Sequence, residues 1–439
     1  MKRYLIFNLA AVVLTTASSM AAEPAPTRDE VLAAMQPYAG PRAAGGVNVS
    51  TLSGKVVAGY QGWFNTPDDG SGRGFRHYSK AGEFRPGRCS IDLWPDVSEL
   101  PAEERTPTEF RHADGRVAEV YSAYRAATAL RHFQWMRDYG LDGVFVQRFV
   151  VETSDPRSLR HCNAVLTAAR EGANRHGRGY AVMYDLSGLK AGEVRRTIED
   201  WKLLVDRMRL GRDAADTRYW RHVGKPIVAV WGVGFNDGRG YTLDECATLI
   251  DFLKHDPQYG GNAVLLGVPT GWRTLNRDAT DDAALHAVLQ KADIVSPWTV
   301  GRYHNPEAVV RHAERDWKPD LAWCREHKLD YLPVVFPGFS WHNMRPESPS
   351  DQIPRLRGEF LWRQFTAAKQ AGATMIYVAM FDEVDEATAI FKCTNNPPVG
   401  ASRFVTYEGL PSDHYLWLTG QGAKLIRGEI PVTAELPHR

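Results

Sequence analysis

The sequence has little cysteine, almost no net charge and few long apolar runs, and each shortage excludes a class of protein. Its five cysteines are far apart and show no CxxC or Cys/His metal spacing. A net charge of +1 gives no excess of basic residues that would attract a nucleic acid. Beyond the N-terminal residues, no stretch is long and apolar enough to span a membrane. We therefore expect no nucleic-acid partner, membrane span, metal or cofactor. We expect a monomer with mostly buried thiols and at most one disulfide.

The one marked apolar run lies at the N-terminus and has the pattern of a secretory signal peptide. Lys2 and Arg3 give a basic start, an apolar stretch follows, and small residues occur at positions 19–22. The run is too short for a transmembrane anchor and contains Asn8. We expect residues 1–22 to be removed on export to the periplasm or outside the cell. Residues 23–50 are then expected to form a loosely docked leader.

Eight short apolar runs alternate with helical patterns along the rest of the chain. Between the runs, apolar residues recur at helical spacing, and the pattern of residues 126–139 stops at Gly140, a common helix terminator. The runs are typical of strands buried on both faces and cover residues 56–60, 143–147, 180–184, 226–231, 263–267, 294–298, 331–336 and 375–381. The predicted fold is a single (β/α)8 TIM barrel over residues 51–430. A doubly wound open sheet is the alternative, but the glycines of residues 232–238 have the wrong spacing for its phosphate loop.

The connection after the first strand, residues 65–125, is much longer than the others. In a barrel this insertion would lie over the C-terminal face, where active sites are built. Long loops in compact domains are usually functional or disordered, and the aromatic residues here argue against disorder. We predict an ordered lid that brings Trp94 and Asp96 close to the cavity.

The predicted strand ends carry aromatic rings, amides, carboxylates and guanidinium groups. In a barrel these ends surround one cavity. Aromatic faces suit the C–H faces of sugar rings, and the polar groups match sugar hydroxyls. A single tryptophan more often packs than binds, but tryptophan recurs at five strand ends. The candidate substrate-binding residues are Tyr60, Trp63, Trp94, Gln147, Arg148, Tyr184, Asp185, Trp231, Trp272, Trp298, Arg302, Trp341, Asp382 and Asp385.

Four carboxylates follow the last strand within five residues, at Asp382, Glu383, Asp385 and Glu386. Like charges this close raise one another's pKa values, so stability alone does not favour them. A solvated acidic turn and a calcium loop are alternatives, although the alternating Asp spacing of a known calcium loop is missing. The sequence also lacks a strand-end lysine, a Gly-x-Ser-x-Gly elbow and a two-His metal motif. The remaining interpretation is a pair of catalytic carboxyls in an aromatic cleft, which is the chemistry of glycoside hydrolysis.

Two segments resemble a known group of enzymes. Residues 58–64, Ala-Gly-Tyr-Gln-Gly-Trp-Phe, and residues 382–388, Asp-Glu-Val-Asp-Glu-Ala-Thr, look like the group spanning glycoside hydrolase families 71 and 99. The likeness covers residues 52–428. Family 99 endo-α-mannosidases carry Asn-Glu-Trp-His-Glu-Gly-Thr after the last strand, so Glu383 and Glu386 match its two glutamates. The resemblance implies that Glu383 acts as a base on the sugar 2-hydroxyl, giving a 1,2-anhydro intermediate, and that Glu386 is first general acid and then base.

Four positions of this motif differ from the family pattern. Asp382 replaces Asn, Val384 replaces Trp, Asp385 replaces His and Ala387 replaces Gly. The two retained glutamates favour retained chemistry, whereas the missing Trp and His leave the sugar open, mannose especially. Related exported proteins are described as xylosidase-like or arabinosidase-like.

We therefore expect an exported, retaining glycoside hydrolase that acts on a polysaccharide or oligosaccharide. A non-catalytic carbohydrate-binding barrel is the alternative. Within the acidic segment we expect Glu386 to hold its proton near neutral pH, because like charges surround it and tryptophans exclude water. Glu383 is expected to stay ionised if an amide or an arginine such as Arg148 or Arg302 reaches it.

Overall fold

The computed structural model describes residues 25–439, so the expected signal peptide, residues 1–22, lies outside the described residues. Helix α1, Arg28–Ala33, begins at Thr27 with a reciprocal capping box to Glu30. The following segment is fixed to the outside of the domain, since Val47 N donates to Gly177 O at 2.9 Å and Arg218 donates to the carbonyls of Ala43, Gly45 and Val47. The described part of the expected leader is therefore tied to the domain by hydrogen bonds.

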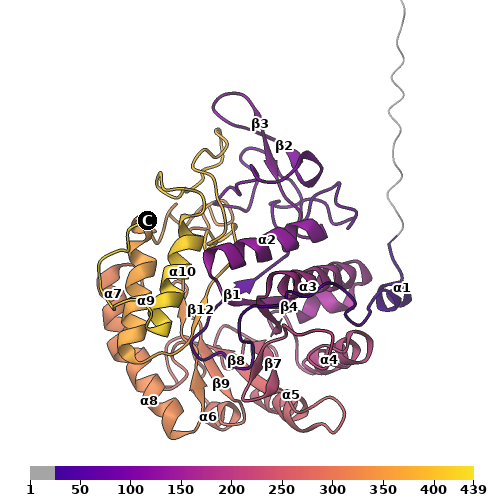
Figure 1. Cartoon of the computed structure of the whole chain (residues 1–439), viewed down its shortest axis with the longest axis vertical. Helices are drawn as coiled ribbons and strands as arrows, with labels where there is room; N and C mark the ends of the chain where they lie inside the picture. The colour runs from indigo at the N-terminus through magenta and orange to yellow at the C-terminus, as the bar shows by residue number, and fades with distance from the viewer. Residues whose placement is uncertain (1–24) are drawn as a thin grey trace, which may run out of the picture.

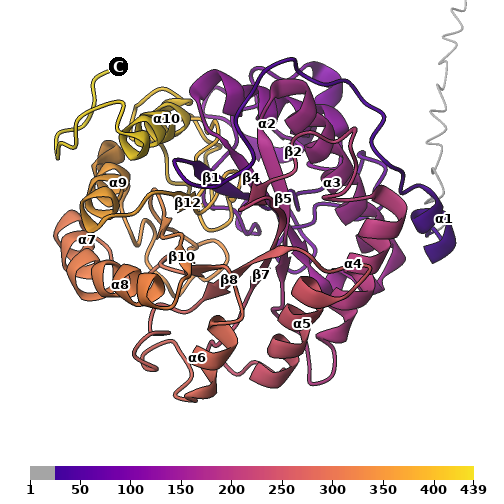
Figure 2. The same cartoon turned by 60° about the horizontal axis from the view of Figure 1, so that its bottom comes forward.

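A curled parallel sheet forms the centre of the fold, with helices around it (Figures 1 and 2). Its strand order is β10-β9-β8-β7-β5-β4-β1-β12-β11, and the short strand β6, Arg221–His222, pairs antiparallel with β7. The parallel strands are β1 (Val56–Tyr60), β4 (Gly143–Phe149), β5 (Gly179–Asp185), β7 (Lys225–Trp231), β8 (Ala263–Val268), β9 (Ile294–Pro297), β10 (Asp330–Tyr331), β11 (Val334–Val335) and β12 (Ile376–Val378). Each coincides with a predicted run, and the TIM-barrel fold is confirmed.

The seventh predicted run is divided into β10 and β11 at Leu332 and Pro333. Leu332 N donates to Val295 O of β9, and Tyr377 N of β12 donates to Pro333 O. The run therefore passes from one edge of the curled sheet to the other and closes the barrel. Proline has no backbone N–H to donate to a ladder, which accounts for the interruption at this position.

Helices cover the outside of the sheet, with their apolar faces against it (Figure 2). Helix α2 has the predicted boundaries and ends at Gly140, whose φ of 81° is the left-handed conformation that glycine adopts readily. A π-helical turn, Ala313–Trp317, joins α7 to α8. The helices are α2 (Ala126–Tyr139), α3 (Pro156–His176), α4 (Arg195–Met208), α5 (Leu243–His255), α6 (Ala284–Leu289), α7 (Pro306–His312), α8 (Lys318–Glu326), α9 (Glu359–Ala371) and α10 (His414–Arg427).

The insertion after β1 is ordered and docks on the segment that follows β12. It contains an antiparallel hairpin of β2, Thr106–Arg111, and β3, Val117–Val120. The backbone N–H groups of Asp92 and Leu93 both donate to Val384 O, at 2.9 and 3.0 Å. The insertion therefore packs directly against the carboxylate-rich segment. All five cysteines are free thiols and four of them are buried, so no disulfide forms.

Candidate active site

Asp382 fixes the carboxylate-rich segment, residues 382–386, to the end of β1. Its side chain is fully buried and accepts hydrogen bonds from the backbone N–H groups of Gln61 and Gly62, both at 2.8 Å. Burial raises the pKa of Asp382 to about 7, although the two N–H groups favour the ionised form. This contact joins the first and last strands of the barrel and sets the positions of the side chains beyond them.

A cavity of about 270 Å³ opens at the C-terminal ends of β1, β4, β5, β7, β9 and β12. This carboxyl cavity is small for a ligand pocket. Its walls combine indole and phenyl rings with amide, hydroxyl and carboxyl groups, and none of the lining side chains is basic. The lining residues are Gln61, Trp63, Gln147, Phe149, Asp185, Ser187, Trp231, Trp298, Glu383 and Glu386.

Glu383 lies in the cavity wall and receives two neutral hydrogen bonds. Gln61 Nε2 donates to Oε1 at 2.9 Å, and Thr388 Oγ1 donates to Oε2 at 2.7 Å. Burial and the neighbouring carboxyls of Glu386 and Asp385 raise its pKa well above the usual value. The two donors act in the opposite direction and favour the ionised form.

Glu386 lies in the same wall but is partly exposed, and its carboxyl has no hydrogen-bond partner among residues 25–439. Burial and then the nearby charge of Asp385 raise its pKa to about 8. A carboxyl without donors is easier to protonate than one that accepts two hydrogen bonds. The expected proton on Glu386 near neutral pH therefore has a structural cause.

A residue of the insertion packs against the aromatic rings that line the cavity. His77 stacks on Trp63 with ring centroids 4.1 Å apart and an interplanar angle of 6°, and Trp63 in turn stacks on Phe149 at 5.5 Å. On the other side of the cavity, Trp231 meets Trp298 edge to face at 5.6 Å. These rings give the cavity two aromatic sides.

Seven of the predicted site residues line this cavity: Trp63, Gln147, Asp185, Trp231, Trp298, Glu383 and Glu386. The prediction omitted Gln61, Phe149 and Ser187 from its set of site residues. Side chains alternate between the two faces of a strand. Because Gln147 faces the cavity, Phe149 must face it too, and this alternation is the signal that was not used.

The same alternation corrects three predicted substrate-binding residues, whose side chains point out of the barrel. Arg148 forms two hydrogen bonds of 2.7 Å with Asp200, and the Tyr184 hydroxyl donates to Asp200 at 2.7 Å. The Tyr60 hydroxyl is 2.9 Å from His132 Nδ1. All three side chains are buried against the surrounding helices.

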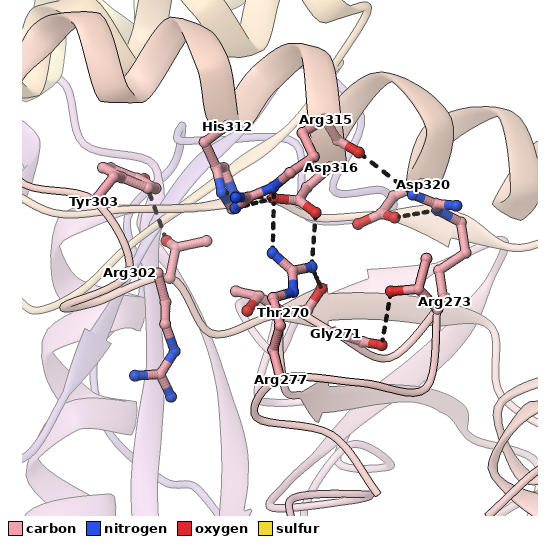
Figure 3. Close-up of polar contacts among 12 residues, drawn as sticks. Thr270, Gly271, Arg273, Arg277, Arg302, Tyr303, His312, Arg315, Asp316 and Asp320 are labelled. Carbon is pink, nitrogen blue, oxygen red and sulfur yellow. Dashed lines mark hydrogen bonds and ion pairs between the residues drawn. The ribbon is translucent and has the colours of Figure 1, made fainter. Parts of the chain in front are cut away.

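Four predicted residues on loops also lie outside the cavity walls. Trp272 is fully buried and packs on Trp323 at 4.9 Å. Arg302 forms an ion pair with Asp278 at 2.8 Å, and Figure 3 shows its side chain pointing away from the nearby Asp316 network. The other two are Trp341, whose ring contacts Phe339 and Arg345, and Trp94, whose ring packs on Phe84 and Phe110 of the insertion and on Phe404 of the segment before α10.

Asp382 and Asp385 support the site without lining the cavity. Asp385 is buried, with one carboxylate oxygen 3.8 Å from His77 Nδ1, and burial raises its pKa to about 7. The donors that reach Glu383 are the Gln61 amide and the Thr388 hydroxyl, whereas Arg148 and Arg302 pair with Asp200 and Asp278 instead.

Metal-binding clusters and membrane-spanning helices are absent from the part of the chain that the structure describes. Within residues 25–439, no group of three or more His, Cys, Asp or Glu side chains could hold a metal ion. In the same part of the chain, no helix has the length and apolar character that crossing a membrane requires.

A TIM barrel with two glutamates facing one aromatic cavity has the architecture of a glycoside hydrolase. Comparison with known proteins agrees with this class. Residues 301–427, which include both glutamates, match the model of Glycosyl hydrolase family 99. The expected resemblance to family 99 is therefore confirmed, and the match supports a glycoside hydrolase.

Solved structures show the same fold. The GH99 endo-alpha-mannosidase from Bacteroides thetaiotaomicron superposes with a TM-score of 0.62 at 16% identity, covering 86% of this chain and 99% of that chain. A glycoside hydrolase-like protein gives a TM-score of 0.55 at 14% identity, covering 89% of this chain and 98% of that chain. No curated protein matches the sequence.

Proposed function

We propose that the protein is an exported, retaining glycoside hydrolase that cleaves a polysaccharide or oligosaccharide with Glu383 and Glu386. The observation that carries this proposal is the unequal surroundings of two carboxyls in one cavity. Glu383 accepts two hydrogen bonds, whereas Glu386 accepts none among residues 25–439. A pair of carboxyls with different proton affinities is what acid and base roles require.

Glu383 is suited to act as the base. The donors Gln61 and Thr388 hold its two oxygens and favour the charged form. In the first step Glu383 takes the proton of the sugar 2-hydroxyl while O2 attacks C1. The bond from C1 to the leaving oxygen breaks, and a 1,2-anhydro sugar forms.

Glu386 is suited to act as the general acid, because burial and then the charge of Asp385 raise the pKa of its carboxyl to about 8, and no donor among residues 25–439 favours its charged form. It donates its proton to the leaving oxygen in the first step. In the second step it removes a proton from a water molecule that attacks C1, and Glu383 returns its proton to O2. Two inversions at C1 give net retention of configuration.

The cavity walls suit a sugar ring. Trp63 and Phe149 line one side of the cavity and Trp231 and Trp298 line the other, so aromatic ring atoms on both sides can contact the C–H groups of a sugar. Gln147, Asp185 and Ser187 offer partners for hydroxyls. The lining has no basic side chain, so an uncharged sugar fits better than an acidic one.

The test is a screen of the purified mature chain against aryl glycosides and polysaccharides, with the anomeric configuration of the first product followed by NMR. We expect hydrolysis with retention, and loss of activity in Glu383→Gln. Asp251→Asn is the matched control, because the Asp251 side chain is 48% exposed and forms an ion pair with Lys291 at the surface. An inverted product would refute the mechanism, and polysaccharide binding without any hydrolysis would favour the non-catalytic barrel.

Export is a separate part of the proposal and rests on the pattern of residues 1–22. N-terminal sequencing of protein recovered outside the cytoplasm should begin near Ala22 or Glu23. Recovery of Met1 there would contradict it.

A further inference from the structure

A second cavity, which the proposed reaction does not use, lies beside the insertion. Its volume of about 660 Å³ is well within the range of ligand pockets and exceeds that of the carboxyl cavity. Three segments form its walls: residues 94–98, the β2–β3 hairpin with the residue before it, and residues 394–396. Its polar side chains include Asp96, Arg105, His112, Arg116, Glu119 and Asn396.

The floor of this insertion cavity is held by backbone pairing and aromatic packing. Asp96 N donates to Lys392 O at 2.9 Å, and Thr394 N donates to Trp94 O at 3.0 Å. The Trp94 ring is 1% exposed, and its Nε1 donates to Glu119 O at 3.1 Å. The residue that the sequence placed in the active site thus builds the floor of a different cavity.

The charged groups of the walls balance one another. Arg105 pairs with Glu119 at 3.1 Å on one wall. Arg116 pairs with Asp114 at 2.7 Å, and Asp96 adds a further carboxylate. The insertion cavity therefore has no excess of positive charge to select an acidic ligand.

The walls of the insertion cavity offer a ligand both hydrogen-bond acceptors and hydrogen-bond donors. The carbonyl of Asn396 can only accept, so His112 Nδ1 donates to it, at 2.8 Å, and His112 Nε2 of the neutral ring is an acceptor. Arg116, whose side chain is 73% exposed, adds guanidinium donors to the same walls. Each unmet donor or acceptor favours a ligand that supplies its complement. Hydroxyl groups both donate and accept, so a polyhydroxylated ligand satisfies such a mixed wall.

We propose that the insertion cavity is an accessory binding site for a neutral polysaccharide chain. The choice of ligand rests on the proposed function, which makes a polysaccharide the substrate. The site lies on the same chain segment as the catalytic carboxyls, because Thr394 and Asn396 belong to the loop that continues from Glu386. Binding there holds the polymer on the enzyme without contributing to bond cleavage.

The test is affinity electrophoresis of the full mature chain in gels that contain one soluble polysaccharide each. Neutral mannan, xylan, arabinan and glucan form one arm, and polygalacturonate forms the acidic arm. Glu386→Gln is the background, so that the polymer is not digested during the run. The cavity variants in that background are His112→Ala with Arg116→Ala, and Ser98→Trp, which fills the space from an exposed wall position. Lys291→Ala, at an exposed ion pair elsewhere, is the matched control.

We expect at least one neutral polysaccharide to retard the background protein, and both cavity variants to weaken that retention about tenfold. With Glu386 restored, the cavity variants should keep full activity on small aryl glycosides. Equal retention of the background, cavity and control proteins in every gel would overturn the site, as would no retention in any gel. Retention only by polygalacturonate would overturn the neutral ligand. Loss of retention in the cavity variants, together with no hydrolysis by the unaltered chain, would keep the site and refute the proposed function.

Discussion

Two groups of buried carboxylates in this molecule have opposite neighbours. Asp316 and Asp320, behind the loops that follow β8 and β9, face arginines: Asp316 binds Arg277 at 2.7 Å and Arg315 at 2.8 Å, and Asp320 binds Arg273 at 2.7 Å (Figure 3). Within the described residues 25–439, the carboxylates of residues 382–386 receive hydrogen bonds only from backbone N–H groups, an amide and a hydroxyl. The same side chains are therefore built into two different electrostatic environments.

The two groups of carboxylates also differ in their pKa values. Burial would raise the pKa of Asp316, but hydrogen bonds from His312 and Arg277 hold it well below the usual value. Burial raises the pKa of Asp320 to about 6 against the opposing effect of Arg273, whereas it raises that of Glu386 to about 8. Carboxylates paired with arginines stay ionised and support structure, whereas unpaired ones can carry a proton at neutral pH. The acids without an arginine partner are therefore the ones suited to proton transfer.

The largest expected effect is catalytic and should appear only in the unpaired group. Glu386→Gln should lower kcat/KM on glycosides with poor leaving groups by roughly 10²- to 10⁴-fold, the usual contribution of a general acid. Activated aryl glycosides need little protonation and should lose less in the first step. Steady-state kinetics on a series of leaving groups measures this. Full activity of the variant on natural glycosides would place the acid elsewhere.

The next effect is on stability and should appear only in the paired group. Asp316→Asn removes the charge that pairs with Arg277 and Arg315, and should lower the free energy of unfolding by about 2–3 kcal/mol. This is less than for a fully buried pair, because the Arg315 side chain is 61% exposed. Asp385→Asn, the matched change in the unpaired group, should be neutral or stabilising at pH 8. Urea unfolding of both variants decides this, and an equal loss in both would remove the distinction.

A smaller effect concerns the pH dependence of stability. The folded-state pKa values of Asp382 and Asp385, about 7, and of Glu386, about 8, exceed the ordinary values of 3.8 and 4.5. The folded state therefore binds more protons than the unfolded state between about pH 4 and pH 8, and the stabilisation by these groups is lost as the pH rises. One such group changes the free energy of unfolding by at most about 1.4 kcal/mol per pH unit.

Removing one titrating group tests this sign. Asp385→Asn should show a smaller fall in Tm between pH 5.5 and pH 8.5 than the unaltered chain, measured by calorimetry. Asp316→Asn should leave this fall unchanged, because the pKa of Asp316 lies below that window. An unchanged fall in Asp385→Asn would mean that the Asp385 carboxyl is already ionised in the folded protein across this window.

The smallest expected effect tests the hydrogen bond from Thr388 that distinguishes Glu383 from Glu386. Thr388→Val removes the hydroxyl that donates to Glu383 at 2.7 Å and keeps the shape of the side chain. We expect about a tenfold loss in kcat/KM, the equivalent of one hydrogen bond to a charged group. The pH profile should also shift, because Glu383 then binds its proton more tightly. A change in KM alone, with no shift of the profile, would contradict the role of Thr388.

The strands could be predicted closely from the sequence, because each is a short apolar run bounded by turn residues. Helix α2 could be placed to the residue, since its apolar spacing stops at Gly140. The break between β10 and β11 at Pro333 could also have been predicted, because proline has no backbone N–H to donate to a strand ladder.

The site was predicted only in part, for two physical reasons. Arg148 and Tyr184 were misplaced although strand alternation, counted from Gln147 and Asp185, would have put them outside. The loop residues Trp272 and Arg302 are different, because their directions depend on partners far away in the chain, Trp323 and Asp278. No local pattern carries that information.

The hydrogen bonds from the backbone N–H groups of Gln61 and Gly62 to Asp382 have a consequence for biosynthesis. Asp382 lies 321 positions after Gln61 and 320 positions after Gly62 in the sequence. The carboxyl cavity needs side chains from both of these regions. A chain still being made has Gln61 and Trp63 long before Glu383 and Glu386 emerge, and loop closure over such a distance is slow. The proposed catalytic centre is therefore among the last parts of the molecule to be assembled, and a chain that stops short of residue 386 lacks one of its two glutamates.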